Sequence, residues 1–294
     1  MRGQVGGQSR LYGLLGRPVS HSLSPVMHEA AFLAQGMNYR YQAFQVEPEA
    51  LPMAVTGLKA LGVAGVNVTI PHKEAILPLL DEVTENARLV GAVNTIVHRN
   101  GRLIGYNTDG WGFLCALEEA GVRPTGARAV VLGAGGAARA IASHLILAGA
   151  AHVAVLNRTL DKAERLVAEL TASLRAAKGP SYHLPPFVAG RLASEALIRG
   201  ADLVVNCTAL GMGELAGESP LADSGWLRPG AVVYDTVYRP AETRLLQEAK
   251  AAGNQAIGGL GMLVHQGACA WEYWFGRRGP TSIMWAAAKA ALAE

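Results

Sequence analysis

The stretch that most constrains the fold of this 294-residue chain is an apolar strand that runs through a glycine-rich turn into a helix. Ala129-Val130-Val131-Leu132 is a continuous apolar run, as expected of a strand buried on both faces of a parallel sheet. It leads into Gly133-Ala134-Gly135-Gly136-Ala137-Ala138, and a helix is predicted from there to Ala148. Another apolar strand is predicted at His152–Leu156. The pattern is a strand–helix–strand unit, which indicates an α/β protein with a parallel sheet.

The glycine-rich turn has the composition of a dinucleotide-binding loop. The first glycine, Gly133, allows a sharp turn, and Gly135 lets the backbone approach a pyrophosphate. The small Ala138 lets the helix pack closely on the strand, and the helix start offers unpaired N–H groups to a phosphate. The other interpretation is an ordinary tight turn between a strand and a helix.

The end of the next strand indicates which dinucleotide binds. An NAD site usually has an acidic residue there, which holds the ribose 2′-hydroxyl. This chain has Asn157-Arg158-Thr159 instead. Arg158 can pair with a 2′-phosphate and stack on adenine, whereas a carboxylate would repel the phosphate. The sequence therefore predicts NADP rather than NAD, with a solvated surface arginine as the alternative.

Strands and helices alternate along the rest of the chain, which predicts a largely parallel sheet in the first half as well. Asn100-Gly101 predicts the turn of a hairpin, and Ser24 is predicted to cap a helix that begins at Pro25. The further predicted strands are 11–16, 39–46, 65–69, 92–97, 103–105, 201–207 and 231–235; the further predicted helices are 25–34, 51–61, 73–80, 111–120, 160–174, 194–200, 243–252, 262–275 and 282–293.

Composition excludes several classes of protein. A net charge of +3 gives no electrostatic case for binding nucleic acid or a membrane surface. No apolar run approaches the length of about 18 residues that a membrane span needs, and the first ten residues are expected to form a loose polar leader rather than a signal peptide. Three widely spaced cysteines favour reduced thiols and a cytoplasmic location. The histidines lack neighbouring ligands at metal-binding spacing, so no metal site is expected.

Polar side chains gather in the first 110 residues where predicted strands end, which is where open α/β sheets bind ligands. Ser22 and Ser24 are separated by one residue at a predicted helix start. Two hydroxyls beside the positive end of a helix would make a good carboxylate receptor. The alternative is that these serines only cap the helix.

Further polar groups stand near the ends of the following strands, and Thr69, Lys73, Asn94 and Asp109 are the candidates. Each alone would be unremarkable. Together they supply hydrogen-bonding groups for an alcohol, one proton donor and one carboxylate. Reduction of a carbonyl needs a proton at the oxygen as hydride reaches the carbon. A lysine beside an aspartate can deliver it, which is typically worth roughly 10²–10⁴-fold in rate.

This combination of motifs resembles the shikimate dehydrogenase family. The segments that carry the resemblance occur in the family's order and span most of the chain: Ser22-Leu23-Ser24-Pro25, 67–73, 91–95, Asn107-Thr108-Asp109-Gly110, 133–139, Asn157-Arg158-Thr159, Asp235-Thr236-Val237-Tyr238 and 262–267. The segment 206–212 departs from many relatives, in which other small residues and a proline replace Cys207 and Ala209.

The resemblance implies NADPH-dependent, reversible reduction of 3-dehydroshikimate to shikimate, in the pathway to chorismate and the aromatic amino acids. It also implies two α/β domains separated by a cleft. A mainly parallel substrate-binding domain would comprise residues 1–109 and 259–294, and a Rossmann-type NADP-binding domain would comprise residues 110–258. The expected partner is a small-molecule substrate, and the chain is expected to be a monomer or a homodimer.

The resemblance also implies roles for individual residues, with Lys73 and Asp109 as the catalytic pair. The substrate would be held by Ser22, Ser24, Thr69, Lys73, Asn94, Asp109, Tyr238 and Gln266. NADP would be held by Gly133, Ala134, Gly135, Gly136, Ala137, Arg139, Asn157, Arg158, Thr159, Thr208 and Met262.

Two alternatives stay open. One is a quinate or dual quinate/shikimate dehydrogenase, although relatives that prefer quinate tend to carry threonine at the position of Ser24 and to use NAD. The other is a non-catalytic NADP-binding paralogue, against which the presence of both Lys73 and Asp109 argues.

Overall fold

The computed structural model describes residues 7–179 and 181–293, and the chain divides into two compact units. The first unit runs to Gly112 and resumes at Leu263, and the second is Phe113–Met262. These limits fall within α5 (Asp109–Glu119) and α10 (Leu260–Phe275), two helices that continue from one unit into the other. Most of the predicted leader, residues 1–6, lies outside the described residues, and Arg10 already belongs to the first strand.

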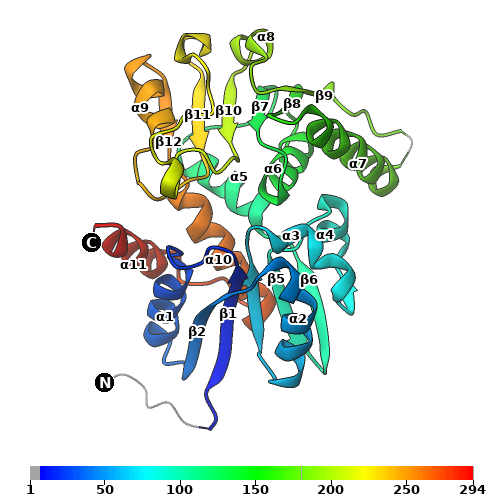
Figure 1. Cartoon of the computed structure of the whole chain (residues 1–294), viewed down its shortest axis with the longest axis vertical. Helices are drawn as coiled ribbons and strands as arrows, with labels where there is room; N and C mark the ends of the chain where they lie inside the picture. The colour runs from blue at the N-terminus through cyan, green and yellow to red at the C-terminus, as the bar shows by residue number, and fades with distance from the viewer. Residues whose placement is uncertain (1–6, 180, 294) are drawn as a thin grey trace. The chain divides into compact units, whose positions relative to one another are not determined.

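The first unit is built on a six-stranded sheet in the order β2-β1-β3-β5-β6-β4 (Figure 1). β2 and β3 run parallel to β1, whereas β5 runs antiparallel to both β3 and β6. Its elements are β1 (Arg10–Gly16), α1 (Ser24–Ala34), β2 (Tyr39–Gln45), α2 (Leu51–Ala60), β3 (Gly65–Val68), α3 (His72–Ala75), β4 (Glu82–Val83), α4 (Glu85–Val90), β5 (Thr95–Arg99), β6 (Arg102–Tyr106) and α11 (Thr281–Ala293).

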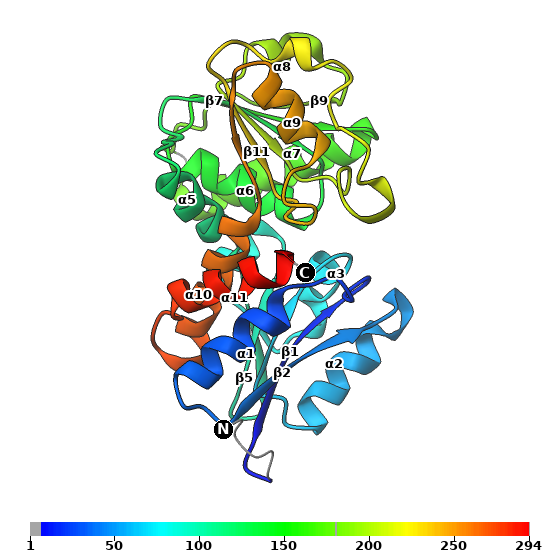
Figure 2. The same ribbon diagram turned by 90° about the vertical axis from the view of Figure 1, so that its left-hand side faces the viewer.

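Alternation along β3 separates the two faces of this sheet. Val66 and Val68 pack into a core that includes the apolar side of α2, as the period of two in a strand requires. Gly65 and Asn67 point to the other face, where the Trp274 ring of α10 lies against Gly65. On that face α10 and α1 supply an aromatic cluster around Tyr12. The last helix, α11, packs along α1 (Figure 2).

The second unit is built on a six-stranded sheet in the order β12-β11-β10-β7-β8-β9, in which every neighbouring pair is parallel (Figure 1). In chain order this is the 3-2-1-4-5-6 arrangement of a dinucleotide-binding sheet, which reverses between β7 and β10. Its elements are β7 (Arg128–Leu132), α6 (Gly136–Leu147), β8 (His152–Asn157), α7 (Leu160–Lys178), β9 (Phe187–Arg191), α8 (Glu195–Arg199), β10 (Leu203–Asn206), β11 (Val232–Asp235), α9 (Arg244–Ala251) and β12 (Gln255–Ile257).

The central strands of the second unit are buried on both faces. Val130 and Leu132 of β7 pack with Ile198 of α8 and Leu245 of α9 on one side. Val131 of β7 points to the opposite face and is also fully buried. α6 and α7 pack against β7, β8 and β9. This double coverage explains why the sequence shows uninterrupted apolar runs here.

Several expectations differ from the structure. The first sheet is mainly parallel, as predicted, and within it β5 of the predicted hairpin runs antiparallel to its two neighbours. The predicted helix at 73–80 is a single α-helical turn, α3, followed by a 3₁₀ turn at Leu77–Leu79. Three short strands and one short α-helix were not predicted, namely β4, β9, β12 and α4. Within the described residues no helix is both long and apolar enough to cross a membrane, and none of the three cysteines is in a disulfide.

Candidate active site

Lys73 and Asp109 form an ion pair at the centre of the first unit's polar groups. The Lys73 Nζ lies 2.6 Å from Asp109 Oδ2, and the side chains are only 14% and 4% exposed. Lys73 stands in α3, just after the end of β3, and Asp109 is the first residue of α5. The backbone N–H of Val93 donates to the Lys73 carbonyl at 2.8 Å, which ties α3 to the segment before β5. Because little water reaches the pair, its electrostatic attraction is stronger than that of a surface ion pair.

Asn94 holds the other oxygen of the same carboxylate. Its Nδ2 donates to Asp109 Oδ1 at 2.8 Å and to Thr108 Oγ1 at 2.9 Å. The backbone N–H of Thr108 donates to Asn94 Oδ1 at 2.8 Å. A backbone N–H can only donate, so this bond fixes the orientation of the Asn94 amide and directs its NH₂ group at Asp109. The carboxylate is therefore held between an ammonium and an amide.

Gln266 reaches the same network from α10, far away in the sequence. Asn94 Nδ2 lies 3.3 Å from Gln266 Oε1, and Gln266 Nε2 donates to the Leu263 carbonyl within its own helix at 2.9 Å. The structure thus brings together four of the predicted substrate-binding residues: Lys73, Asn94, Asp109 and Gln266.

Buried residues to which the sequence analysis assigned no role support these four. Asn67 accepts from the Tyr41 hydroxyl at 2.7 Å and donates to Thr95 Oγ1 at 3.0 Å. Thr95 donates in turn to Asn94 Oδ1 at 3.0 Å. Asn107 accepts from the backbone N–H of Asp109 at 3.1 Å. A polar residue in the middle of a buried strand, as Asn67 is, was the available sequence signal, since such a group needs partners.

The two serines lie together at the start of α1. Ser22 Oγ accepts from the backbone N–H of Ser24 at 3.2 Å, and the helix begins at Ser24 itself. The prediction that Ser24 caps the helix is therefore wrong. Ser24 stands in the first turn of α1, and the side-chain oxygen that accepts its backbone N–H belongs to Ser22. Among the described residues, no hydrogen bond joins either serine to the Asn94 network. Thr69 follows β3, and its methyl group packs against Gly16 at the end of β1.

In the second unit, the glycine-rich turn lies at the carboxyl end of β7, beside the point where the strand order reverses. Gly133 has φ +109°, and a Cβ there would lie 2.9 Å from the Cys207 carbonyl oxygen. Gly135 is exposed, with open space where a Cβ would stand. No side chain caps α6, and its first turn contains no acidic residue. A tight turn, an open backbone and a positive helix end fit the pyrophosphate of a dinucleotide.

The end of β8 carries the groups predicted to select the cofactor. Arg158 and Thr159 are exposed, and Asn157 Nδ2 donates to the Thr159 carbonyl at 2.9 Å. Arg158 has no ion-pair partner within the described part of the chain, so its guanidinium is available to bind a phosphate. Arg139 differs, because it is buried between α6 and α7 in an ion pair with Glu169.

The other predicted cofactor and substrate residues of this unit follow β10 and β11. Thr208 donates through its hydroxyl to Asn206 Oδ1 at 2.7 Å. Tyr238 is half-buried in the segment after β11, and Met262 is buried near the start of α10.

Three family models match the chain, and their descriptions agree. Residues 14–96 match the shikimate dehydrogenase substrate binding domain, and residues 116–180 match shikimate / quinate 5-dehydrogenase. Residues 259–289 match the shikimate 5′-dehydrogenase C-terminal domain. A shikimate dehydrogenase (NADP(+)) from Symbiobacterium thermophilum is 58% identical over 97% of this chain and 96% of its own length. This chain belongs to the shikimate dehydrogenase family.

Solved structures of the family share the fold. Shikimate 5-dehydrogenase from Thermus thermophilus, in complex with NADP(H) and shikimate, is 41% identical with a TM-score of 0.84, covering 96% of this chain and all of that one. Quinate dehydrogenase from Corynebacterium glutamicum, in complex with NAD, is 33% identical with a TM-score of 0.85, covering 96% of this chain and 99% of that one. The substrate-binding and dinucleotide-binding α/β folds of the family are therefore those of the two units described here.

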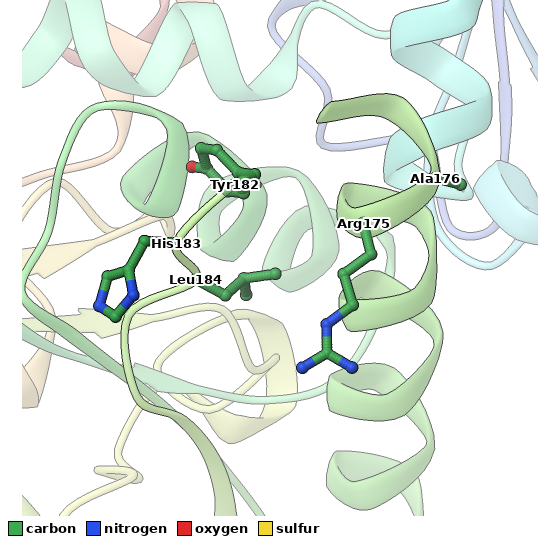
Figure 3. A pocket seen from close by; sticks show the side chains of 5 residues that line it. All are labelled: Arg175, Ala176, Tyr182, His183 and Leu184. Atoms are coloured by element: carbon green, nitrogen blue, oxygen red, sulfur yellow. The ribbon is translucent and has the colours of Figure 1, made fainter. Parts of the chain in front are cut away.

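Two further observations concern metal binding and a pocket outside the candidate site. Within residues 7–179 and 181–293, no three His, Cys, Asp or Glu side chains are grouped so that they could hold a metal ion. A pocket at the end of α7 is lined by Arg175, Ala176, Tyr182, His183 and Leu184 (Figure 3). None of the predicted catalytic, substrate or cofactor residues lines it.

Proposed function

We propose that this protein catalyses the reversible, NADPH-dependent reduction of 3-dehydroshikimate to shikimate, a step in the biosynthesis of chorismate and the aromatic amino acids. The observation that carries the proposal is the sheltered Lys73–Asp109 pair, held by Asn94 in a chain of this family. The printed names of its relatives, NADP(+)-dependent shikimate dehydrogenases, support the substrate and the cofactor.

Bound NADPH supplies the hydride that adds to the carbonyl carbon of the substrate. As negative charge develops on the carbonyl oxygen, the Lys73 ammonium gives it a proton, and the partly exposed amine regains a proton from solvent. Asp109 holds the Lys73 amine in position through their ion pair, and Asn94 keeps the carboxylate from turning away. In the reverse direction, neutral Lys73 removes the proton from the alcohol.

The substrate would be oriented by groups of different chemistry. Ser22, Ser24 and Tyr238 would hold its carboxylate, because hydroxyls and a helix start favour an anion. Its ring hydroxyls would bond to Thr69, Lys73, Asn94, Asp109 and Gln266. NADP would lie on Gly133, Ala134, Gly135, Gly136 and Ala137, with Arg139, Asn157, Arg158, Thr159, Thr208 and Met262 around it.

The decisive experiment is a cofactor-reduction assay that crosses shikimate and quinate with NADP and NAD. The proposal expects kcat/KM to be highest for shikimate with NADP. A higher value for quinate with NAD would instead support a quinate dehydrogenase. Binding of NADP without turnover of either substrate would support the non-catalytic paralogue.

The catalytic pair has a test of its own in Asp109→Asn, which keeps the shape and removes the charge beside Lys73. We expect kcat to fall by roughly 10²-fold, because the general acid loses its charged partner. If KM for shikimate rose while kcat stayed normal, Asp109 would be a ligand for the substrate and not a partner of Lys73.

A further inference from the structure

The second unit contains a buried carboxylate to which the proposed reaction gives no role. Asp235 ends β11 and is 0% exposed, and among the described residues it forms no ion pair. Instead it accepts three hydrogen bonds, from Asn206 Nδ2 at 2.9 Å, Thr243 Oγ1 at 2.6 Å and the Val237 backbone N–H at 3.0 Å. Burial raises the pKa of the Asp235 carboxyl above its ordinary value, and these bonds partly oppose the rise. A carboxylate so placed needs its donors, because leaving a buried charge unsatisfied is costly.

One of these partners, Asn206, ends the neighbouring strand β10 in register with Asp235. Asn206 Oδ1 accepts from both the backbone N–H and the hydroxyl of Thr208, at 2.9 and 2.7 Å. Because that N–H can only donate, the amide oxygen faces Thr208 and the NH₂ group faces Asp235. The same NH₂ group also donates to the Leu210 carbonyl at 3.2 Å. Asn206 therefore shapes the segment 207–210.

Asp235 shapes a second segment in the same way. Its Oδ1 accepts from the backbone N–H of Val237, the residue before Tyr238. The backbone N–H of Thr236 donates to the Asn206 carbonyl at 3.0 Å. One pair of side chains at the ends of two adjacent strands thus holds the start of both following segments.

We propose that Asp235, acting through Asn206 and Val237, is a positioning residue that holds two ligand-facing segments in place. The hydrogen-bonded pair of Asn206 and Asp235 is called the joint below. Segment 207–210 carries Thr208, the predicted contact for NADP, and segment 236–238 carries Tyr238, the predicted contact for the substrate carboxylate. The inference rests on the proposed function for these two contacts. Its distinctive consequence is that loss of the joint loosens both segments together.

The test compares Asp235→Ala with Thr243→Val. Asp235→Ala removes both acceptor oxygens and leaves Asn206 and Val237 without them. Thr243→Val also removes a bond to Asp235 and the cap of α9, but Thr243 donates to neither segment. We expect Asp235→Ala to raise KM for both NADP and shikimate, each about three- to tenfold, as loss of a buried hydrogen bond predicts. We expect Thr243→Val to lower Tm with both KM values near those of the wild type.

Two more variants keep the test decisive. Asp235→Asn keeps an oxygen for Asn206 and Val237 while its amide faces the Thr243 hydroxyl, so it should restore both KM values. Asn206→Asp sets two carboxylates against each other with little change of shape, and should raise both KM values even if Asp235→Ala does not fold. A rise in only one KM, or equal effects of Asp235→Ala and Thr243→Val, would overturn the proposal.

A readout without turnover separates this inference from the proposed function. Hydrogen exchange of the full-length protein, followed by mass spectrometry, should show faster exchange in both 207–210 and 236–238 in Asp235→Ala and in neither segment in Thr243→Val. If wild type lacked activity toward shikimate but this exchange pattern held, the proposed function would fail and the joint would stand. If exchange rose in one segment alone, the joint would fail whatever the activity.

Discussion

The two candidate sites differ in which part of the chain forms them, side chains in the first unit and backbone in the second. In the first unit, Lys73, Asn94, Asp109 and Gln266 meet from four separate places in the chain, and their side chains interlock. In the second unit, the glycine-rich turn is one contiguous segment that presents backbone and open space. The first site can therefore be damaged by removing a side chain, and the second by adding one.

The largest effect is expected from removing the Lys73 amine. Lys73→Ala should lower kcat by roughly 10²–10⁴-fold with a modest change in KM, because the general acid is lost while other groups still bind the substrate. Steady-state kinetics with shikimate and NADP measure this. Lys59→Ala is the matched control, since Lys59 forms an ion pair with Asp81 at 2.8 Å that is well exposed to solvent. Near-normal turnover of Lys73→Ala would remove Lys73 from the catalytic role.

The glycine-rich turn should be broken by a single methyl group. In Gly133→Ala the new Cβ would press on the Cys207 carbonyl oxygen, which is backbone and cannot swing aside. We expect the Kd for NADP to rise by about tenfold or more, as the loop shifts from the pyrophosphate. Calorimetry or fluorescence titration with NADP measures it.

Gly126→Ala controls for the backbone conformation alone. Gly126 has φ +76°, with open space where a Cβ would stand. It should lose about 1 kcal/mol of stability while binding NADP normally. Equal Kd values for the two variants would show that the close approach to Cys207 is unimportant.

Arg158 tests whether a side chain matters at the second site at all. Arg158→Ala should lower kcat/KM with NADP by about tenfold and leave the value with NAD almost unchanged, because only NADP carries the 2′-phosphate. Arg165→Ala, an exposed arginine of α7, should change neither. A parallel loss with both cofactors would mean that Arg158 serves the fold and not the choice of cofactor.

The smallest effect concerns stability in mild acid, where the first unit should lose more stability than the second. Burial lowers the pKa of His28, in α1 of the first unit, to about 3. Below about pH 6.5 His28 takes up a proton in the unfolded chain but stays neutral in the folded protein. The free energy of unfolding therefore falls as pH falls. Between pH 7 and 6 the loss is about 0.7 kcal/mol. In the second unit burial lowers the pKa of His152 by less than it lowers that of His28, and it raises the pKa of Asp235, so these two groups act in opposite directions as pH falls.

Hydrogen exchange resolved by unit, and corrected for its intrinsic pH dependence, measures this contrast. The first unit should lose protection first on acidification, and His28→Gln should remove most of the pH dependence. Earlier loss in the second unit would contradict the expected order.

The sequence determined much of the second unit, because its signals are local. An apolar strand, a turn that tolerates positive φ at Gly133 and a helix without a side-chain cap all lie within about 20 neighbouring residues. The exposure of Arg158 likewise agrees with its place directly after a strand. Short elements such as β9 and β12 escaped prediction because their sequences lack a long apolar run, and pairing with a neighbouring strand decides their structure.

Tertiary structure decided the rest, because the deciding partners are distant in sequence. The sequence marked Asn94 as a candidate, but only the Thr108 N–H fixes which way its amide points. The resemblance implied that Arg139 holds NADP, but the sequence could not show that Glu169, thirty residues further along, forms an ion pair with it. The sequence also could not show that Asn206 and Asp235 end adjacent strands in register. Residue types therefore set which chemistry is available, and contacts across the sheets set where each group points.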